Sequence, residues 1–118
     1  MAEGYLTTHV LDTANGCPAA NIVIELYKLG SERELLLKTI TNEDGRTDKP
    51  LLDKSKFAIG RYELVFYVAE YFSVKSVNID PIPFLDDVVL RFGIAHSEEH
   101  YHVPLLVSPY SYSTYRGS

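Results

Sequence analysis

The sequence predicts an all-β sandwich of two antiparallel sheets with Greek-key connections and one short helix. Three observations lead to this prediction. About seven or eight short segments are rich in β-branched and aromatic residues. They recur roughly every 10–15 residues, with turn residues between them. Only one segment has helical character, and many regularly spaced strands with almost no helix are typical of a β-sandwich.

The first half of the chain supplies three of the predicted strands. Residues 5–12 alternate with period 2, so Leu6, Thr8 and Val10 share one face and His9 lies on the other. The Asn-Gly pair in the cluster that follows marks a turn. The next two strands are predicted at residues 21–29 and 34–40, on either side of a Gly-Ser turn.

The middle of the chain contains two turns, two strands and the helix. A tight polar turn is predicted at residues 42–46, where Gly45 supplies a positive φ. The remaining elements follow in order: an extended piece at 47–52 interrupted by Pro50, a strand at 60–68, a helix at 69–75, a proline-broken loop at 80–86 and a strand at 87–94.

The C-terminal stretch is predicted to form two strands that meet near Ser108-Pro109. The first of them has two different faces. Its apolar face, which requires a core, consists of Tyr101, Val103, Leu105 and Val107. Its other face mixes imidazole, hydroxyl and aliphatic groups, from His100, His102, Pro104, Leu106 and Ser108. Such a mixture suits a pocket or a subunit contact better than a solvated surface.

Length and composition exclude several classes of protein. A chain of 118 residues predicts a single domain, residues 1–118. The net charge of −5 argues against a nucleic-acid partner, which requires a basic patch. No apolar run reaches the roughly 18 residues of a membrane span. The N-terminus lacks the features of a secretory signal, so we expect a cytoplasmic protein, or a peroxisomal one if the source is eukaryotic.

The sequence gives little support for a metal or a reactive thiol. His96, His100 and His102 have spacing that could chelate zinc, but no cysteine lies near, and the adjacent Glu98 and Glu99 are typical of a solvated loop. Cys17 lies in a turn sequence and no motif supports a nucleophile there. We therefore predict no metal and no cofactor.

Single residues leave the function open. His9, in the middle of a strand, and His102 each have an ordinary interpretation as a surface histidine or a hydrogen-bonded core histidine. Arg46 by itself is an ordinary turn arginine, and Tyr115 an ordinary strand aromatic. The chain has no Gly-x-Ser-x-Gly elbow, no P-loop and no dinucleotide fingerprint. The residues alone thus indicate a β-sandwich with an unusual polar and apolar face.

Four stretches resemble the transthyretin-related 5-hydroxyisourate hydrolase family. They are Leu6-Thr-Thr-His-Val-Leu-Asp12 with Gly16-Cys-Pro-Ala19, Asn42-Glu-Asp-Gly-Arg46, Phe66-Tyr-Val-Ala-Glu-Tyr-Phe72, and Tyr101 to Tyr110 running into Tyr115-Arg-Gly-Ser118. The terminal Tyr-Arg-Gly-Ser is the most specific feature, since the related hormone carriers lack it. The carriers also lack counterparts of His9, Arg46 and His102.

The resemblance implies a transthyretin-like sandwich that assembles as a homotetramer, with active sites in a channel between dimers. It implies that Pro104, Leu106 and Ser108 line this channel beside the site, with a burial role for Leu106 and an orienting role for Pro104 expected rather than catalytic roles. The implied partner is a small-molecule substrate.

The implied reaction is hydrolysis of 5-hydroxyisourate at a cyclic amide C–N bond. This chemistry needs a base for water, a group that stabilises the oxyanion, and a clamp for a flat heterocycle. On this resemblance, His9 and His102 handle protons and Arg46 stabilises charge. Substrate binding would also involve the tail, Tyr115, Arg116, Gly117 and Ser118. The alternative is a transthyretin-like carrier that binds a small aromatic ligand in the channel.

Overall fold

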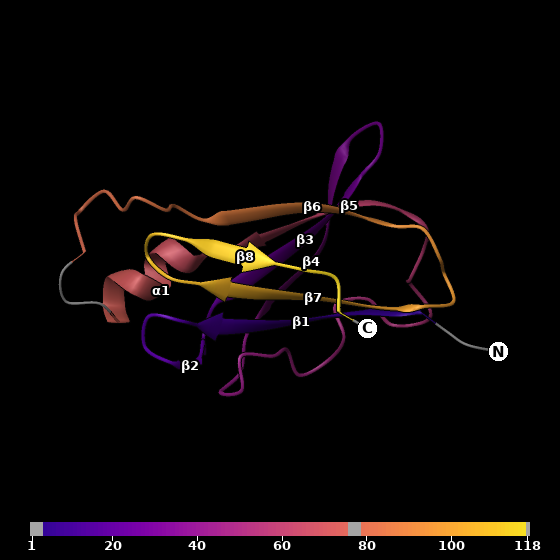
Figure 1. Ribbon diagram of the computed structural model, residues 1–118. Coiled ribbons are helices and arrows are strands. Elements are labelled where there is room, and N and C mark those ends of the chain that lie inside the picture. Colours follow the sequence, from indigo (N-terminus) through magenta and orange to yellow (C-terminus); the bar gives the residue numbers. More distant parts are fainter. Residues whose placement is uncertain (1–3, 76–78, 118) are drawn as a thin grey trace.

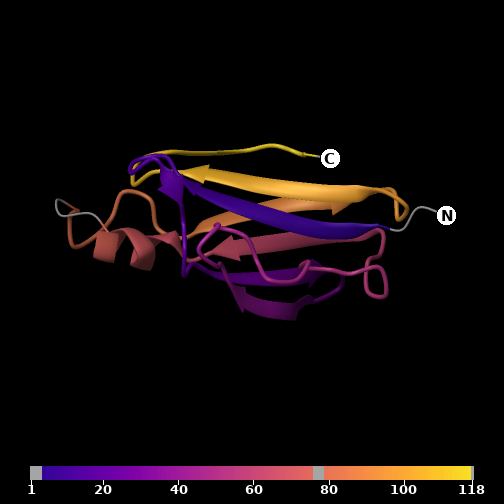
Figure 2. The same cartoon turned by 90° about the horizontal axis from the view of Figure 1, so that it is seen from below.

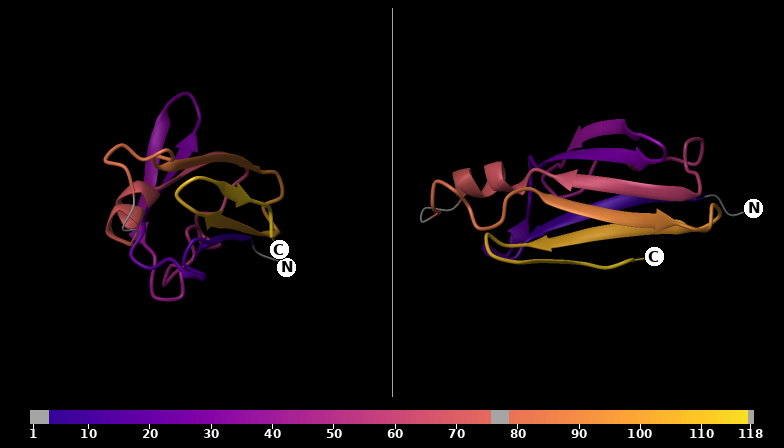
Figure 3. Two further views of the ribbon diagram at one scale, coloured as in Figure 1. Left: turned by 60° about the vertical axis from the view of Figure 1, so that its left-hand side comes forward. Right: turned by 90° about the horizontal axis from the view of Figure 1, so that it is seen from above.

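Two four-stranded sheets pack face to face in the computed structural model, which describes residues 4–75 and 79–117 (Figure 1). Sheet A has the order β2-β1-β7-β8, with bounds Cys17–Pro18, Tyr5–Asp12, His100–Val107 and Tyr112–Thr114. Sheet B has the order β4-β3-β5-β6, with bounds Arg33–Ile40, Val23–Leu29, Gly60–Phe66 and Val88–Ile94. The views in Figure 3 show the two layers, and the predicted β-sandwich is confirmed.

The alternating faces predicted from the sequence form the core between the sheets. On β1, Leu6 and Val10 are fully buried, and the apolar face of β7 is likewise buried. Sheet B contributes fully buried side chains from two central strands, Ile24, Leu26, Leu64 and Phe66. Burial of each large apolar side chain stabilises the fold by about 1.5–3 kcal/mol, so these faces determine the register of the strands.

One pairing departs from the expectation of wholly antiparallel sheets. Strands β1 and β7 run parallel along their whole length, from Tyr5 opposite His100 to Asp12 opposite Val107. The two strands come from opposite ends of the chain, with all of sheet B between them in sequence. No hairpin therefore constrains their relative direction. The short strand β2 was also not predicted, because its two residues lie inside a turn sequence.

The predicted helix is present as α1, Val68–Lys75, at one end of the sandwich (Figure 1). It buries Val68, Tyr71 and Phe72. The Tyr71 hydroxyl donates a 2.7 Å hydrogen bond to the buried carboxylate of Asp12, at the end of β1. The predicted strand 60–68 ends earlier, at Phe66, because Val68 already begins the helix. Among the described residues no helix is long and apolar enough to cross a membrane.

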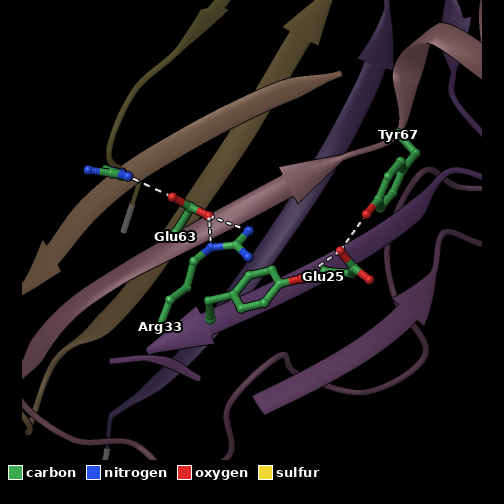
Figure 4. Close-up of polar contacts among 6 residues, drawn as sticks. Glu25, Arg33, Glu63 and Tyr67 are labelled. Carbon is green, nitrogen blue, oxygen red and sulfur yellow. Dashed lines mark hydrogen bonds and ion pairs between the residues drawn. The ribbon is translucent and has the colours of Figure 1, made fainter. Parts of the chain in front are cut away.

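The outer face of sheet B carries an ion-pair network (Figure 4). The Glu63 carboxylate on β5 is only 3% exposed and accepts hydrogen bonds from Nε of Arg33 at 2.7 Å and from Nε of Arg91 at 3.0 Å. Burial by itself raises the pKa of Glu63, but the two guanidinium groups outweigh it and the pKa is lowered. Beside this cluster, Tyr67 donates a hydrogen bond to Glu25. These polar groups lie on the face of sheet B that points away from sheet A, and they stabilise that sheet.

Candidate active site

The free edge of β1 is covered by the loop between β4 and β5, which brings Arg46 to sheet A. Strand β2 pairs only with the end of β1. Nearer the start of β1, the Leu6 amide donates to the Leu52 carbonyl at 2.9 Å. Further along, the Val10 amide donates to the Gly45 carbonyl at 2.8 Å. Arg46 follows Gly45, so these backbone bonds fix its position beside β1.

The predicted turn at residues 42–46, which presents Arg46, is closed by the side chain of Asn42. Its side-chain oxygen accepts hydrogen bonds from the amides of Asp44 at 2.9 Å and Arg46 at 3.2 Å. Gly45 has φ of 74°, which confirms the predicted positive φ. A Cβ atom at position 45 would lie 2.3 Å from the Val10 carbonyl oxygen, so the close approach of the two backbones requires glycine.

His9 faces this loop from the middle of β1. Its Nε2 lies 2.9 Å from the carbonyl oxygen of Asp44. A carbonyl only accepts, so Nε2 carries the hydrogen and Nδ1 is left as a proton acceptor. The pKa of His9 is lowered from its ordinary value, first by burial and then by the positive charge of Arg46. His9 is therefore held as a neutral imidazole at neutral pH.

His102 lies near the start of β7, opposite Thr7 of β1. The Thr7 hydroxyl is 2.8 Å from its Nδ1. The pKa of His102 is lowered, first by burial and then by the positive charge of Arg46, with smaller effects of the neighbouring His100 and His9 rings. The charge of Arg46 thus acts on both histidines, which places one fixed cation and two neutral imidazoles in one region.

A cavity of about 340 Å³ opens between this face of sheet A and the loop that carries Arg46. Its lining includes Arg46, His100 and His102, and the other residues are Thr7, Thr8, Thr47, Asp48, Lys49 and Pro50. This volume lies at the lower end of the range for small-molecule sites. His9 interacts electrostatically with His102 but is not among the lining residues.

The C-terminal tail runs back over β7 and reaches His102, as the yellow trace in Figure 2 shows. The Gly117 amide donates to the His102 carbonyl at 2.7 Å, and the His102 amide donates to the Gly117 carbonyl at 3.3 Å. A Cβ atom at position 117 would lie 3.0 Å from Cδ2 of His102. The tail therefore supports the histidine through its backbone, and only glycine fits without displacing the ring.

The side chains of the preceding tail residues lie outside the cavity. Arg116 donates to Glu99 Oε1 at 2.9 Å, and its guanidinium lies 4.0 Å from the centre of the Tyr101 ring. Tyr115 is 60% exposed and borders a different hollow, beside Phe92. Of the other predicted residues, Ser118 lies outside the described residues.

The three residues predicted to line a channel are not part of this cavity. Pro104 is buried, and its carbonyl accepts a 2.7 Å hydrogen bond from the Thr114 hydroxyl. Leu106 is half-buried near the other end of the strand, and Ser108, also half-buried, follows its last residue. In this single chain they continue the outer face of β7 away from His102.

Of the residues that line the cavity, Arg46 and His102 were predicted as site residues and the others were not. Among the others, Thr7 and His100 contact His102 or share its face. Period 2 places Thr7 on the same face as His9, and His100 on the same face as His102. That signal was available, but the parallel register that puts the two pairs side by side was not.

The histidines of the spacing His-x3-His-x-His do not gather at one point. His100 and His102 share the Thr7 hydroxyl. His96 instead faces Glu98 at 3.7 Å on the loop before β7. Within the described residues, the one group whose ligand atoms lie close enough for an ion is His96, Glu98 and Glu99. Glu99 of that group is already bonded to Arg116.

Comparison with known proteins places this architecture in a family. The model of the HIUase/Transthyretin family matches residues 6–117. A 5-hydroxyisourate hydrolase of Pseudomonas aeruginosa is 57% identical, over 98% of this chain and 92% of the relative. The structure of a Klebsiella pneumoniae 5-hydroxyisourate hydrolase is similar with a TM-score of 0.79 and 30% identity, over 98% of this chain and 99% of that one.

A second solved structure, an (S)-allantoin synthase, superposes more closely. Its TM-score is 0.92 at 50% identity, and the match covers 99% of this chain but 44% of the synthase chain. The family match over nearly the whole length and the high identity of full-length relatives agree with the fold. The chain therefore belongs to the HIUase/Transthyretin family.

Proposed function

We propose that this protein hydrolyses 5-hydroxyisourate at a cyclic amide C–N bond and thereby opens the six-membered ring. The product is 2-oxo-4-hydroxy-4-carboxy-5-ureidoimidazoline, so the reaction belongs to urate degradation. The names of the full-length relatives support a hydrolase with this substrate. The observation that carries the proposal is one arginine at a cavity, whose charge lowers the pKa of His102 in the cavity and of His9 beside it.

In this proposal His102 is the general base. Burial and Arg46 lower its pKa, so the ring is unprotonated at neutral pH and can accept a proton from water. Its Nδ1 is occupied by Thr7, and among the described residues its Nε2 has no hydrogen-bond partner. Nε2 is therefore the nitrogen available to the attacking water.

Arg46 stabilises the oxyanion that forms when water adds to the acyl carbon. Its guanidinium is permanently charged and presents a planar set of donors, which suits the carbonyl groups of a urate-like ring. His9, oriented by its bond to the Asp44 carbonyl, offers Nδ1 to a substrate N–H group. Arg46, which lines the cavity, would hold the flat substrate against His102, and His9 would contact it from outside the lining residues.

The tail contributes to substrate binding in the proposal through Tyr115, Arg116, Gly117 and Ser118. Gly117 is the member that contacts His102 within this chain. The Tyr115 side chain is exposed, so a role for it requires a neighbouring subunit.

We propose a homotetramer, in which the exposed outer face of sheet A meets the same face of another dimer. Pro104, Leu106 and Ser108 would then line the channel between dimers beside the site. A polar cavity wall of Arg46, Asp48 and Lys49 supports a substrate with several hydrogen-bonding groups. A cytoplasmic location remains a prediction from the sequence.

A coupled assay tests the function. Urate oxidase generates 5-hydroxyisourate from urate, and its absorbance decay is followed with and without this protein. The expected result is accelerated decay, which His102→Asn abolishes. Equal decay rates with and without the protein would refute the proposal, and thyroxine binding measured by calorimetry in that case would support a carrier.

A further inference from the structure

One hydroxyl group connects the two histidines of the cavity. Thr7 Oγ1 lies 2.9 Å from Nε2 of His100 and 2.8 Å from Nδ1 of His102. In the parallel register of β1 and β7, Tyr5 lies opposite His100 and Thr7 lies opposite His102. The Tyr5 ring stacks on His100 with centroids 4.1 Å apart and planes 23° apart. This packing fixes the His100 ring with one nitrogen aimed at Thr7.

The bonding capacity of a hydroxyl restricts the protons of this group. Thr7 has one hydrogen to donate, so it donates to one histidine and accepts from the other. If Thr7 donates to His100, it accepts from Nδ1–H of His102, and Nε2 of His102 is then free to take a proton. If Thr7 donates to His102, then Nε2 of His102 carries the hydrogen. Both arrangements are neutral tautomers of His102: in the first, Nε2 can accept a proton, and in the second, Nε2 already carries one.

Because Arg46 lies near His102, the arrangement in which Thr7 donates to a neutral His102 is favoured once His102 has taken a proton from water. A base that takes a proton from water becomes a cation, and a cationic His102 would be repelled by the fixed charge of Arg46. Transfer of positive charge to His100 moves it further along β7, where the ring is half-exposed and can be solvated. The hydroxyl between the rings supplies a path of two hydrogen bonds for this transfer.

We propose that Thr7 and His100 form a proton relay behind His102, an inference that rests on the hydrolase function proposed above. As water attacks the substrate, its O–H bond breaks and an Nε2–H bond forms on His102. The Nδ1 proton of His102 passes to Thr7 Oγ1, and the Thr7 hydroxyl proton passes to Nε2 of His100. His102 ends neutral, His100 ends as the imidazolium, and the hydroxide oxygen is bonded to the substrate. Thr7 and His100 are positioning and relay residues, while His102 remains the group that touches water.

The test uses Thr7→Val, which removes the hydroxyl at nearly constant volume, and Thr7→Ser, which keeps it. Thr13→Val is the matched control, since its hydroxyl bonds only the Val107 carbonyl beyond the other end of β1. General-base catalysis contributes roughly 10²–10⁴-fold, so loss of its relay is expected to lower kcat by about 10- to 100-fold. KM should change less than about twofold, and Thr7→Ser should recover most of kcat.

Two further readouts separate a relay from a structural role. In mixtures of H₂O and D₂O, kcat of the wild type should depend on deuterium content along a curve, because several protons move together, and Thr7→Val should give a straight line. Nitrogen-15 NMR of the histidine rings should show His102 protonated at Nδ1 in the wild type and a mixture of tautomers in Thr7→Val. His100→Phe keeps the stack on Tyr5 but removes Nε2, and it should reproduce the linear dependence, with His96→Phe as its control.

The outcomes are distinct. A folded Thr7→Val variant with wild-type kcat and a curved deuterium dependence would overturn the relay while leaving the hydrolase function intact. Should Thr7→Val fail to fold, the same two readouts on His100→Phe decide the matter. A wild-type protein that does not accelerate 5-hydroxyisourate decay would instead overturn the proposed function on which the relay rests.

Discussion

Val10 and Gly45 meet backbone to backbone, with the Val10 amide donating to the Gly45 carbonyl at 2.8 Å and no room for a Cβ atom at position 45. This contact joins the loop to the unpaired edge of β1. Because Arg46 follows Gly45, this contact fixes where along β1 the arginine lies. It therefore also fixes the distance between the arginine and the two histidines. The position of the charge that we propose for catalysis therefore depends on Gly45, which has no side chain to take part in the chemistry.

Gly45→Ala should both destabilise the protein and impair catalysis. An alanine there has a positive φ, which costs roughly 1–2 kcal/mol, and its Cβ meets the Val10 carbonyl oxygen at 2.3 Å. Gly16→Ala is the matched control, because Gly16 has a similar φ of 67° but nothing within 4 Å of the added atom. Chemical denaturation should show a loss larger for position 45 by at least about 1 kcal/mol. Equal losses at the two positions would mean that the loop adapts.

His102→Asn should lower kcat by roughly 10²–10⁴-fold, because an amide cannot accept the proton of water. His96→Asn on the exposed loop is the control and should keep wild-type activity. Size-exclusion chromatography with light scattering should give the same oligomeric state for both variants. Near wild-type turnover in His102→Asn would remove this residue from the mechanism and leave His9 as the base.

Arg46→Glu should abolish turnover and also raise the pKa of His9 and His102. The positive charge of Arg46 disfavours the imidazolium forms, so its replacement by a negative charge favours them. In the wild type, a lowered pKa means that activity persists as pH falls below about 6.5 and is lost only near the folded-state pKa. Proton NMR titration of the histidines checks the direction, with the exposed Arg61→Glu on sheet B as control.

An unchanged titration in Arg46→Glu would mean that Arg46 does not contribute to the pKa values of the two histidines. Burial is the larger cause for both residues, so the expected rise is partial. The loss of activity in Arg46→Glu would then be attributed only to the loss of oxyanion stabilisation.

The sequence predicted much of the fold because apolar and polar residues alternate regularly along two strands. Leu6 and Val10 share the buried face of β1, and Leu105 and Val107 share the buried face of β7. It also predicted the turn at Gly45, where the Asn-Glu-Asp-Gly pattern is local. It could not predict that β1 and β7 run parallel, since strand direction depends on the path of the intervening sheet. The resemblance gave His9, Arg46 and His102. The hydroxyl bridge of Thr7 to His100 requires the register, which only the structure supplies.

Glu63→Gln should make the protein less stable at neutral pH and less sensitive to acid. The folded-state pKa of Glu63 is lowered, so its ion pairs stabilise the fold above the unfolded value of 4.5, and this contribution is lost as pH falls through the lower folded value. The side chains of Arg33 and Arg91 are 48% and 72% exposed, so water solvates the two guanidinium groups when Glu63 is replaced. The free energy of unfolding at neutral pH should therefore fall by only about 1–3 kcal/mol. Urea unfolding at pH 7 and at pH 3 measures both effects, with Glu34→Gln as the exposed control. A variant as stable as wild type at pH 7 would show the cluster to be neutral.

Removal of residues 115–118 should abolish activity with little loss of fold, because the core between the sheets is made by residues upstream.

Glu99→Gln is a milder change to the same segment, because it weakens the hydrogen bond from Arg116 to Glu99. The Arg116 guanidinium also packs on the Tyr101 ring, and the next residue, Gly117, pairs with the backbone of His102. We expect kcat to fall by a smaller factor in Glu99→Gln than in the truncation, with the melting temperature nearly unchanged. Glu98→Gln is the matched control on the same loop. Insoluble protein after truncation would instead show that the tail is needed for folding, and full activity in Glu99→Gln would show that the Gly117 backbone pair holds the tail by itself.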